Sequence, residues 1–212
     1  MEDVLDVYAR PYDPSRPVVC VDELSKQLHS SPHGREPLGP GRIAKEDYEY
    51  ARHGTRNVFL AVEPLAGRRT VRVTQRRTAV DFAHELRRIV MHDYADADMV
   101  VLVTDNLNTH SLGCLYEAFD PAEAHSIARR IEWHYTPEHG SWLNMAEIEL
   151  SALAVQCLNR RIGSAVLLER EVTAWQQARN GRRVRIDWQF TTADARVKLR
   201  RLYPQLKPQP SG

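Results

Sequence analysis

The feature that most constrains the fold is a run of five apolar residues, Met99–Val103, that leads directly to Thr104 and Asp105. An unbroken valine-rich run is typical of a strand that is buried on both faces, as parallel strands between two helical layers are. A second apolar run, Pro17–Val21, leads to Asp22 in the same way. Two parallel strands that end at aspartates place both carboxylates at one edge of a sheet, where α/β proteins bind ligands. The sequence therefore predicts an α/β fold with an acidic site at that edge.

A third carboxylate is expected on the helix that follows Ser141, the residue predicted to cap it. On a helical wheel with 100° between successive residues, Glu147 falls inside the apolar face of this helix and Glu149 falls on a more polar flank. A carboxylate on a core-facing stripe needs a cationic partner, either an arginine or a metal ion. We therefore favour Glu147 over Glu149 as the third acid. The apolar face consists of Leu143, Ala146, Leu150, Leu153, Ala154, Cys157 and Leu158.

The three acids Asp22, Asp105 and Glu147 offer hard oxygen ligands. Such ligands suit Mg²⁺ or Mn²⁺, which keep several waters and bind substrate phosphate beside a few carboxylates. The structural alternative is that the two aspartates cap loops and that Glu147 pairs with an arginine.

Three stretches around these acids resemble the acidic motifs of DDE transposases, in the insertion-sequence group related to the mariner elements. They are Cys20–Glu23, Thr104–Asn106 followed by His110, and Leu143–Glu147. Many relatives have proline and isoleucine where this chain has Met145 and Ala146, and a shorter gap before the third acid, which leaves Glu149 open as the alternative. Further similar stretches extend the resemblance over nearly the whole chain: Tyr12–Pro14, Tyr50–Thr55, Glu63–Leu65, Asp81–Ala83 and Phe190–Arg196.

The resemblance implies a ribonuclease-H-like mixed sheet of about five strands flanked by helices. We expect a lead-in segment over 1–16, the catalytic domain over 17–160, and a helical, basic C-terminal extension over 161–212. Local patterns predict further strands near 48–52, 57–63, 69–75 and 131–136. They predict helices over 79–92, 111–119, 120–130 and 164–180, with Ser164 as the cap of the last.

The resemblance also implies two Mg²⁺ or Mn²⁺ ions per site, held by Asp22, Asp105 and Glu147 with Asp22 bridging both. These ions would support DNA strand cleavage and then strand transfer by the liberated 3′-hydroxyl. Asn106, His110 and Asn144 are the candidates for positioning the substrate.

Basic residues could contact the DNA backbone, although the net charge is only +1 and just four of the 29 basic residues are lysines. Arginine favours bidentate phosphate contacts. Solvated strand and tail surfaces are the ordinary alternative explanation. The candidate arginines form two groups in the sequence: Arg72, Arg76 and Arg77, and then Arg182, Arg183 and Arg185, which precede Trp188 and Phe190.

We therefore expect a bacterial, cytoplasmic and nucleoid-associated DNA transposase whose partners are transposon ends, target DNA and a second copy of the chain, with no membrane association. A separate helix-turn-helix chain is a further expected partner, because this sequence has no such domain. The alternatives are a structure-selective nuclease of the same fold and an inactive remnant that binds only DNA or a partner. A Walker phosphate loop, a paired-cysteine zinc motif and a glycine-rich dinucleotide fingerprint are absent from the sequence.

Overall fold

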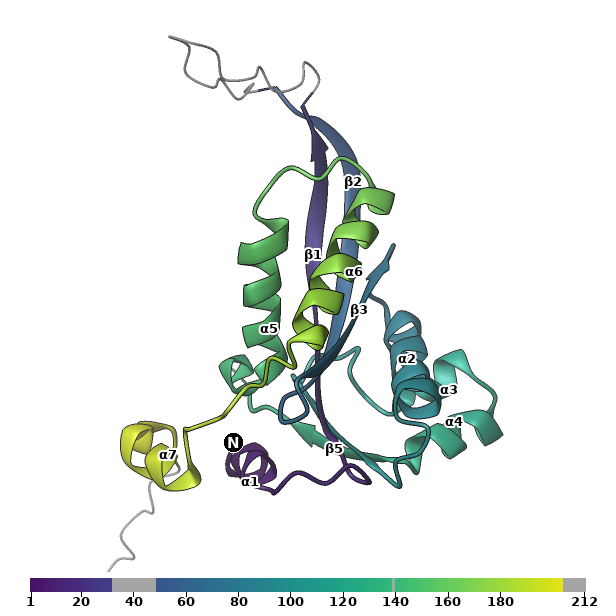
Figure 1. Ribbon diagram of the computed structural model, residues 1–212. Helices are drawn as coiled ribbons and strands as arrows, with labels where there is room; N and C mark the ends of the chain where they lie inside the picture. The colour runs from purple at the N-terminus through teal and green to yellow at the C-terminus, as the bar shows by residue number, and fades with distance from the viewer. Residues whose placement is uncertain (32–48, 139, 204–212) are drawn as a thin grey trace, which may run out of the picture.

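A five-stranded mixed sheet lies between two helical layers in the computed structural model, which describes residues 1–31, 49–138 and 140–203 (Figure 1). The strand order is β3-β2-β1-β4-β5. The three strands β1, β2 and β3 pair in antiparallel fashion, whereas β1, β4 and β5 run parallel to one another. The strands are β1 (Val18–Ser30), β2 (Ala51–Glu63), β3 (Arg68–Thr74), β4 (Val100–Thr104) and β5 (Ile131–Tyr135).

The helical elements agree closely with the local patterns of the sequence. Ser164 caps α6, Asp120 caps α4, and Thr78 forms a capping box with Asp81 at the start of α2, as expected. The elements are α1 (Glu2–Tyr8), α2 (Ala79–Arg88), η1 (Ile89–Asp93), α3 (Gly113–Ala118), α4 (Pro121–Ala128), η2 (Ser141–Leu143), α5 (Met145–Leu153), η3 (Ala154–Leu158), α6 (Ala165–Gly181), α7 (Thr192–Lys198) and η4 (Arg200–Leu202).

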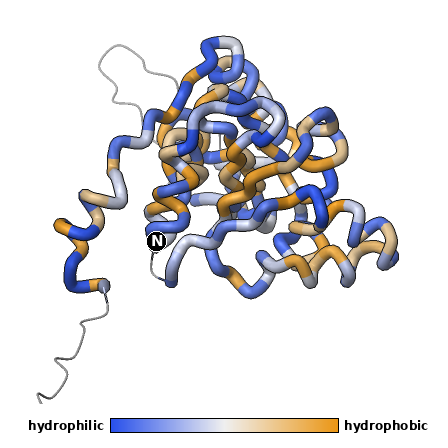
Figure 2. Tube along the Cα trace, turned by 90° about the horizontal axis from the view of Figure 1, so that it is seen from below, coloured by the Kyte–Doolittle hydropathy of each residue, from blue (hydrophilic) through white to orange (hydrophobic). Residues whose placement is uncertain are grey.

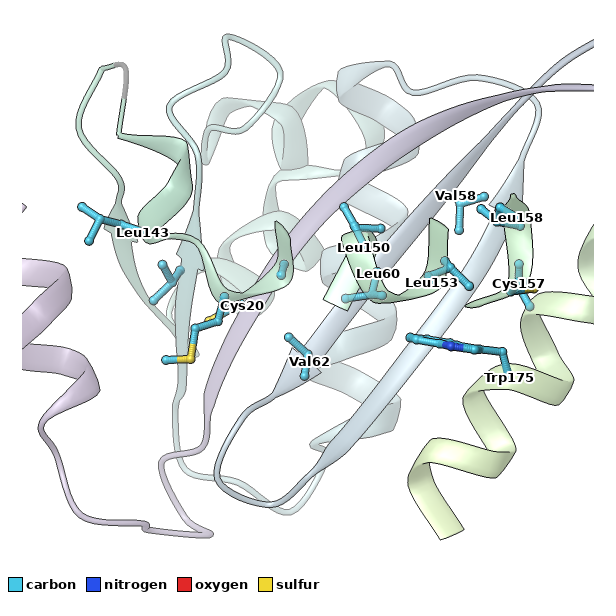
Figure 3. Packing of buried hydrophobic residues seen from close by; sticks show 14 of the residues in the cluster. Cys20, Val58, Leu60, Val62, Leu143, Leu150, Leu153, Cys157, Leu158 and Trp175 are labelled. Atoms are coloured by element: carbon cyan, nitrogen blue, oxygen red, sulfur yellow. The ribbon is translucent and has the colours of Figure 1, made fainter. Parts of the chain in front are cut away.

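Alternate residues of each central strand pack into different helical layers. In β4, Val101 and Val103 belong to the core under α5 and α6, whereas Val100 and Leu102 belong to the core under α2, α3 and α4. This alternation explains why β4 is apolar without interruption. Figure 3 shows the α5 side of the core, where Leu150, Leu153 and Trp175 lie beside the strands; the labelled strand residues are Cys20, Val58, Leu60 and Val62.

Strand β1 does not end at Asp22, as the sequence suggested, but continues to Ser30. Beyond Glu23 it still pairs with β2, from Leu24 opposite Val58 to Ser30 opposite Ala51. The expectation was wrong because the antiparallel partner satisfies the backbone of a polar stretch that has no apolar pattern of its own. The strands expected near 48–52 and 57–63 are accordingly one strand, β2, while Tyr48 lies outside the described residues.

The two ends of the chain also pack on this core. The expected polar lead-in contains α1, whose Val4, Leu5 and Val7 are buried. Helix α7 contacts α1 and buries Ala195 against the same core, and Figure 2 shows this helix on the side of the molecule where the N-terminus lies. In the described part of the expected C-terminal extension, α6, α7 and η4 are helical and the stretch between α6 and α7 is not. Within the three described ranges, no helix combines the length and the hydrophobicity needed to cross a bilayer.

Candidate active site

Asp22 and Asp105 lie side by side where strands β1 and β4 part. Val18 is paired with Val101 and Cys20 with Val103, so the same register, two residues further on, places Asp22 level with Asp105. Asp22 is only 9% exposed, and its Oδ1 accepts the backbone N–H of Glu23 at 2.8 Å. Strand β4 ends at Thr104 while β1 continues to Ser30, so both aspartates lie where the two strands part.

Glu147 reaches this place from the first turn of α5, which is tied to β1 by Asn144. The Asn144 side chain is fully buried, accepts the backbone N–H of Ala146 at 3.1 Å and donates to the carbonyl of Val21 at 3.0 Å. Asn144 is therefore the cap of α5, and the prediction of Ser141 was wrong. Ser141 instead begins the 3-10 turn η2, which separates it from the helix.

The pKa of Asp22 reflects both its burial and the charges of its neighbours. Burial, together with the negative charges of Asp105, Glu23 and Glu147, raises the pKa of Asp22 to about 7 against the opposing hydrogen bond from the amide of Glu23. Such repulsion between carboxylates falls off steeply with distance. Asp105, at the end of β4, and Glu147, on α5, therefore lie near enough to Asp22 for their charges to act on it.

His110 bridges two carboxylates at the edge of this site. Its Nδ1 lies 2.5 Å from Oδ1 of Asp105 and its Nε2 lies 3.1 Å from Oε2 of Glu23, while its ring packs on Phe82 with the centroids 4.1 Å apart. Burial lowers the pKa of His110, but the hydrogen bonds to Asp105 and Glu23 outweigh burial and raise it to about 9. The pKa of Asp105 is lowered in turn, because its bond to His110 outweighs its own burial. His110 therefore acts as an imidazolium that orients Asp105.

Glu149 is the fully buried glutamate of α5, and the sequence-based assignment of Glu147 to the buried face was wrong. Glu149 is 0% exposed, whereas Glu147 is partly exposed. The carboxylate of Glu149 pairs with Arg179 at 2.6 Å and with Arg69 at 3.1 Å. The helical wheel gave the wrong burial because it counts only the residues of the helix itself. The polar flank that carries Glu149 is buried against β3 and α6, which supply Arg69 and Arg179.

Comparison with known proteins identifies the family. A model of the DDE superfamily endonuclease family matches residues 17–168. The chain belongs to this family. No curated protein matches the sequence.

Solved structures of the Mos1 transposase share the fold of this DDE endonuclease domain. The Mos1 strand transfer complex superposes with a TM-score of 0.55 at 15% identity, over 86% of this chain and 54% of that chain. The Mos1 mariner paired end complex with Mn gives 0.50 at 16% identity, over 86% and 55%, and the paired-end complex with the left transposon end gives 0.50 at 13% identity, over 86% and 56%. The chain thus spans little more than half the length of these proteins. The predicted ribonuclease-H-like fold and the predicted DDE family are confirmed.

The acids of this DDE domain would have to rearrange to hold a metal ion together. In the described ranges, no three His, Cys, Asp or Glu side chains stand ready as a ligand set. The reason is visible in the contacts, because Asp105 is turned to His110 and Asp22 to the amide of Glu23. The residues nevertheless fit divalent cations, since crowding of carboxylates around the buried Asp22 is relieved by positive charge.

The candidate arginines fall in two separate places. Arg77 lies beside the acids, 3.4 Å from Glu23, and its charge helps to lower the pKa of Asp105. The exposed Arg76 precedes it, whereas Arg72 is held by Glu85 at 2.9 Å on the α2 side of the sheet. The second group lies near the opposite end of β3, beside the β2–β3 turn. Its exposed members are Arg182, Arg183 and Arg185.

Two further residues near the site differ from the sequence-based expectation. Glu23 was given no role, and Asn144 was given a different one. Glu23 holds His110 and Arg77 together, and its position directly after Asp22 is the signal that could have pointed to it. Asn144 was expected to contact substrate, but its side chain is used inside the protein to tie α5 to β1. Asn106 is exposed directly after Asp105, so it remains a candidate for substrate contact.

Proposed function

We propose that this chain is the catalytic domain of a DNA transposase that cuts and joins DNA strands with Asp22, Asp105 and Glu147. The observation that carries the proposal is that the buried Asp22 stands level with Asp105 in the strand register and that the charges of Asp105 and Glu147 both act on it. Membership of the DDE endonuclease family supports the same assignment.

The three acids would hold two divalent cations, Mg²⁺ or Mn²⁺. Bound cations supply Lewis-acid activation of a water or a 3′-hydroxyl and neutralise charge on the phosphate. The chain's own residues set up this chemistry. His110 holds the Asp105 carboxylate in one orientation, Asn144 fixes the start of α5 against β1, and Arg77 adds positive charge beside the acids, where a phosphate would lie.

The DNA backbone would contact both groups of arginines. Arg183 and Arg185 line a cleft of about 520 Å³ together with Tyr12 and Leu65. An exposed tyrosine between arginines suits a DNA strand, because the ring offers a stacking surface and the guanidinium groups pair with phosphates. Arg182 directly precedes Arg183 in the sequence. At the other end of β3, Arg76 and Arg77 would make the DNA contacts nearest to the acids.

The expected partners follow from the likeness to Mos1. The solved Mos1 complexes are a strand transfer complex and paired-end complexes, one of them with the left transposon end and one with Mn. For this chain we propose transposon ends and target DNA as substrates, and a second copy of the chain as the partner that brings two ends together. A separate chain with a helix-turn-helix would supply recognition of the end sequence.

The test is nicking of a supercoiled plasmid and joining of an oligonucleotide 3′ end to that plasmid, with Mg²⁺ or Mn²⁺. Asp22→Asn, Asp105→Asn and Glu147→Gln should each abolish both reactions while the circular dichroism spectrum is kept, and the exposed Asp187→Asn should retain them. Nicking without joining would indicate a nuclease. DNA binding without either reaction would indicate an inactive remnant. Nicking that survives all three substitutions would refute the assigned site.

A further inference from the structure

The fully buried carboxylate of Glu149 ties the helix α5 to two other elements. Arg179 of α6 donates from Nε and Nη2 to the two oxygens of Glu149, at 3.0 and 2.6 Å. The Nε of Arg69, in β3, lies 3.1 Å from Oε2 of the same carboxylate. A bidentate arginine pair is directional, so it constrains the helix in a way that contact between apolar side chains does not.

Arg69 is itself held firmly. Its side chain is 0% exposed and donates to the carbonyls of Gly67, at 3.2 Å, and of Val184. Its backbone N–H and C=O both bond to the side-chain amide of Asn180, at 2.9 and 2.8 Å. The group that holds Glu149 is therefore anchored in the edge strand of the sheet, in α6 and in the segment that follows α6.

Glu147 lies between this group and a second attachment at the start of α5. Asn144 ties that end of the helix to the carbonyl of Val21, next to Asp22. Two positions along a helix correspond to a turn of about 200°, so Glu147 and Glu149 point to nearly opposite sides. Glu149 consequently faces away from the acids and acts on Glu147 only through the backbone of α5.

We propose that Arg69, Glu149 and Arg179 form a clamp that sets the rotation and height of α5 and thereby positions Glu147 against Asp22. The three are positioning residues. The inference rests on the proposed function, which gives Glu147 its role as a metal ligand. Helix α5 also packs through Met145, Ala146, Leu150 and Leu153, but apolar packing tolerates small rotations that would displace a carboxylate at the site.

The test compares Glu149→Gln with Ile127→Ala in the full chain. Ile127 is 0% exposed and belongs to the core on the opposite face of the sheet, so its truncation weakens the fold without touching α5. Mn²⁺ binding is followed by the electron paramagnetic resonance signal of the free ion. Glu149→Gln should raise the dissociation constant at least tenfold, while Ile127→Ala should leave it within twofold. Should Glu149→Gln fail to fold, Arg179→Gln, at a side chain that is 17% exposed, should give the same shift.

Two results separate this inference from the proposed function. Equal Mn²⁺ affinity in all folded variants, with thermal stability lowered in both Glu149→Gln and Ile127→Ala, would overturn the clamp and leave the function intact. A wild-type chain whose Mn²⁺ binding is absent, or is unchanged by Asp22→Asn, would overturn the function. In that case, hydrogen exchange measured without metal tests the clamp separately. The clamp predicts faster exchange of the α5 amides in Glu149→Gln than in Ile127→Ala. Equal exchange in the two variants would refute the clamp.

Discussion

Replacing Asp22 by asparagine should stabilise the metal-free protein at neutral pH while removing its function. Asp22 is buried, and burial followed by the charges of Asp105, Glu23 and Glu147 raises its pKa from 3.8 to about 7. Each pKa unit corresponds to about 1.4 kcal/mol, so the ionised carboxylate costs the fold on the order of 4 kcal/mol. Asparagine has nearly the same shape and keeps an oxygen for the amide of Glu23, so it should recover most of this free energy.

The sign of the pH dependence follows from linkage. The folded-state pKa of Asp22 lies above the unfolded value, so the folded protein binds this proton more tightly than the unfolded chain. The penalty is therefore absent below about pH 4, grows as the pH rises, and is complete above about pH 7. Wild type and Asp22→Asn should unfold at similar temperatures at pH 4, and the variant should unfold roughly 10 °C higher at pH 8.

Thermal unfolding in EDTA at a series of pH values measures this difference. Asp96→Asn is the control, since Asp96 is exposed in the turn before β4 and its replacement should change the free energy of unfolding by less than about 0.5 kcal/mol. The reasoning is refuted if Asp22→Asn is no more stable than wild type at pH 8. It is equally refuted if the gain is the same at pH 4 and pH 8, because the gain then has no connection with the charge.

Three further changes probe the surrounding structure by urea denaturation. Asn144→Ala should cost about 2–3 kcal/mol, because α5 loses its cap and the buried carbonyl of Val21 loses its donor. Gly67→Ala should destabilise the fold more than Gly54→Ala. Both glycines have positive φ, but a Cβ at Gly67 would lie 2.6 Å from the backbone of Arg183 and one at Gly54 would meet open space. Arg183→Gly should stabilise by about 1 kcal/mol, since Arg183 has a φ of +47°, while a salt titration of DNA binding should show a slope smaller by about one.

Each of these changes has a result that contradicts its premise. A cost below about 0.5 kcal/mol for Asn144→Ala would mean that α5 is not held by this side chain. Equal losses at the two glycines would mean that the close approach to the β2–β3 turn carries no energetic weight. Unchanged DNA affinity in Arg183→Gly would remove the cleft beside Tyr12 from the proposed DNA path.

Elements with a strong local pattern could be predicted from the sequence alone. The valine run of β4 and the capped helices α2, α4 and α6 appear where expected, because their signals are read from neighbouring residues. Strand β1 beyond Glu23 could not be predicted, because its polar residues are ordered by hydrogen bonds to β2, thirty or so residues away. Helix α1 was missed for a similar reason, since its three apolar side chains matter only once the core they enter is known.

The candidate site divides in the same way. Asp105 could be placed because it follows a buried strand directly, and Asp22 because its strand pairs in parallel with the first. The choice between Glu147 and Glu149 was made from a helical wheel that gave the wrong burial for both. The resemblance of Leu143–Glu147 to an acidic motif does not depend on burial and also pointed to Glu147, which stays a prediction.

The sequence by itself determined the elements with a strong local pattern, among them the two apolar strands that lead to Asp22 and Asp105, because these properties depend on short-range periodicity. Only the tertiary structure decided which glutamate of α5 is buried and which arginines neutralise it. It also decided that His110 joins Asp105 to Glu23. These outcomes depend on partners far apart in the chain. A carboxylate becomes a site residue or an interior ion pair according to the charges that folding brings within a few ångströms of it.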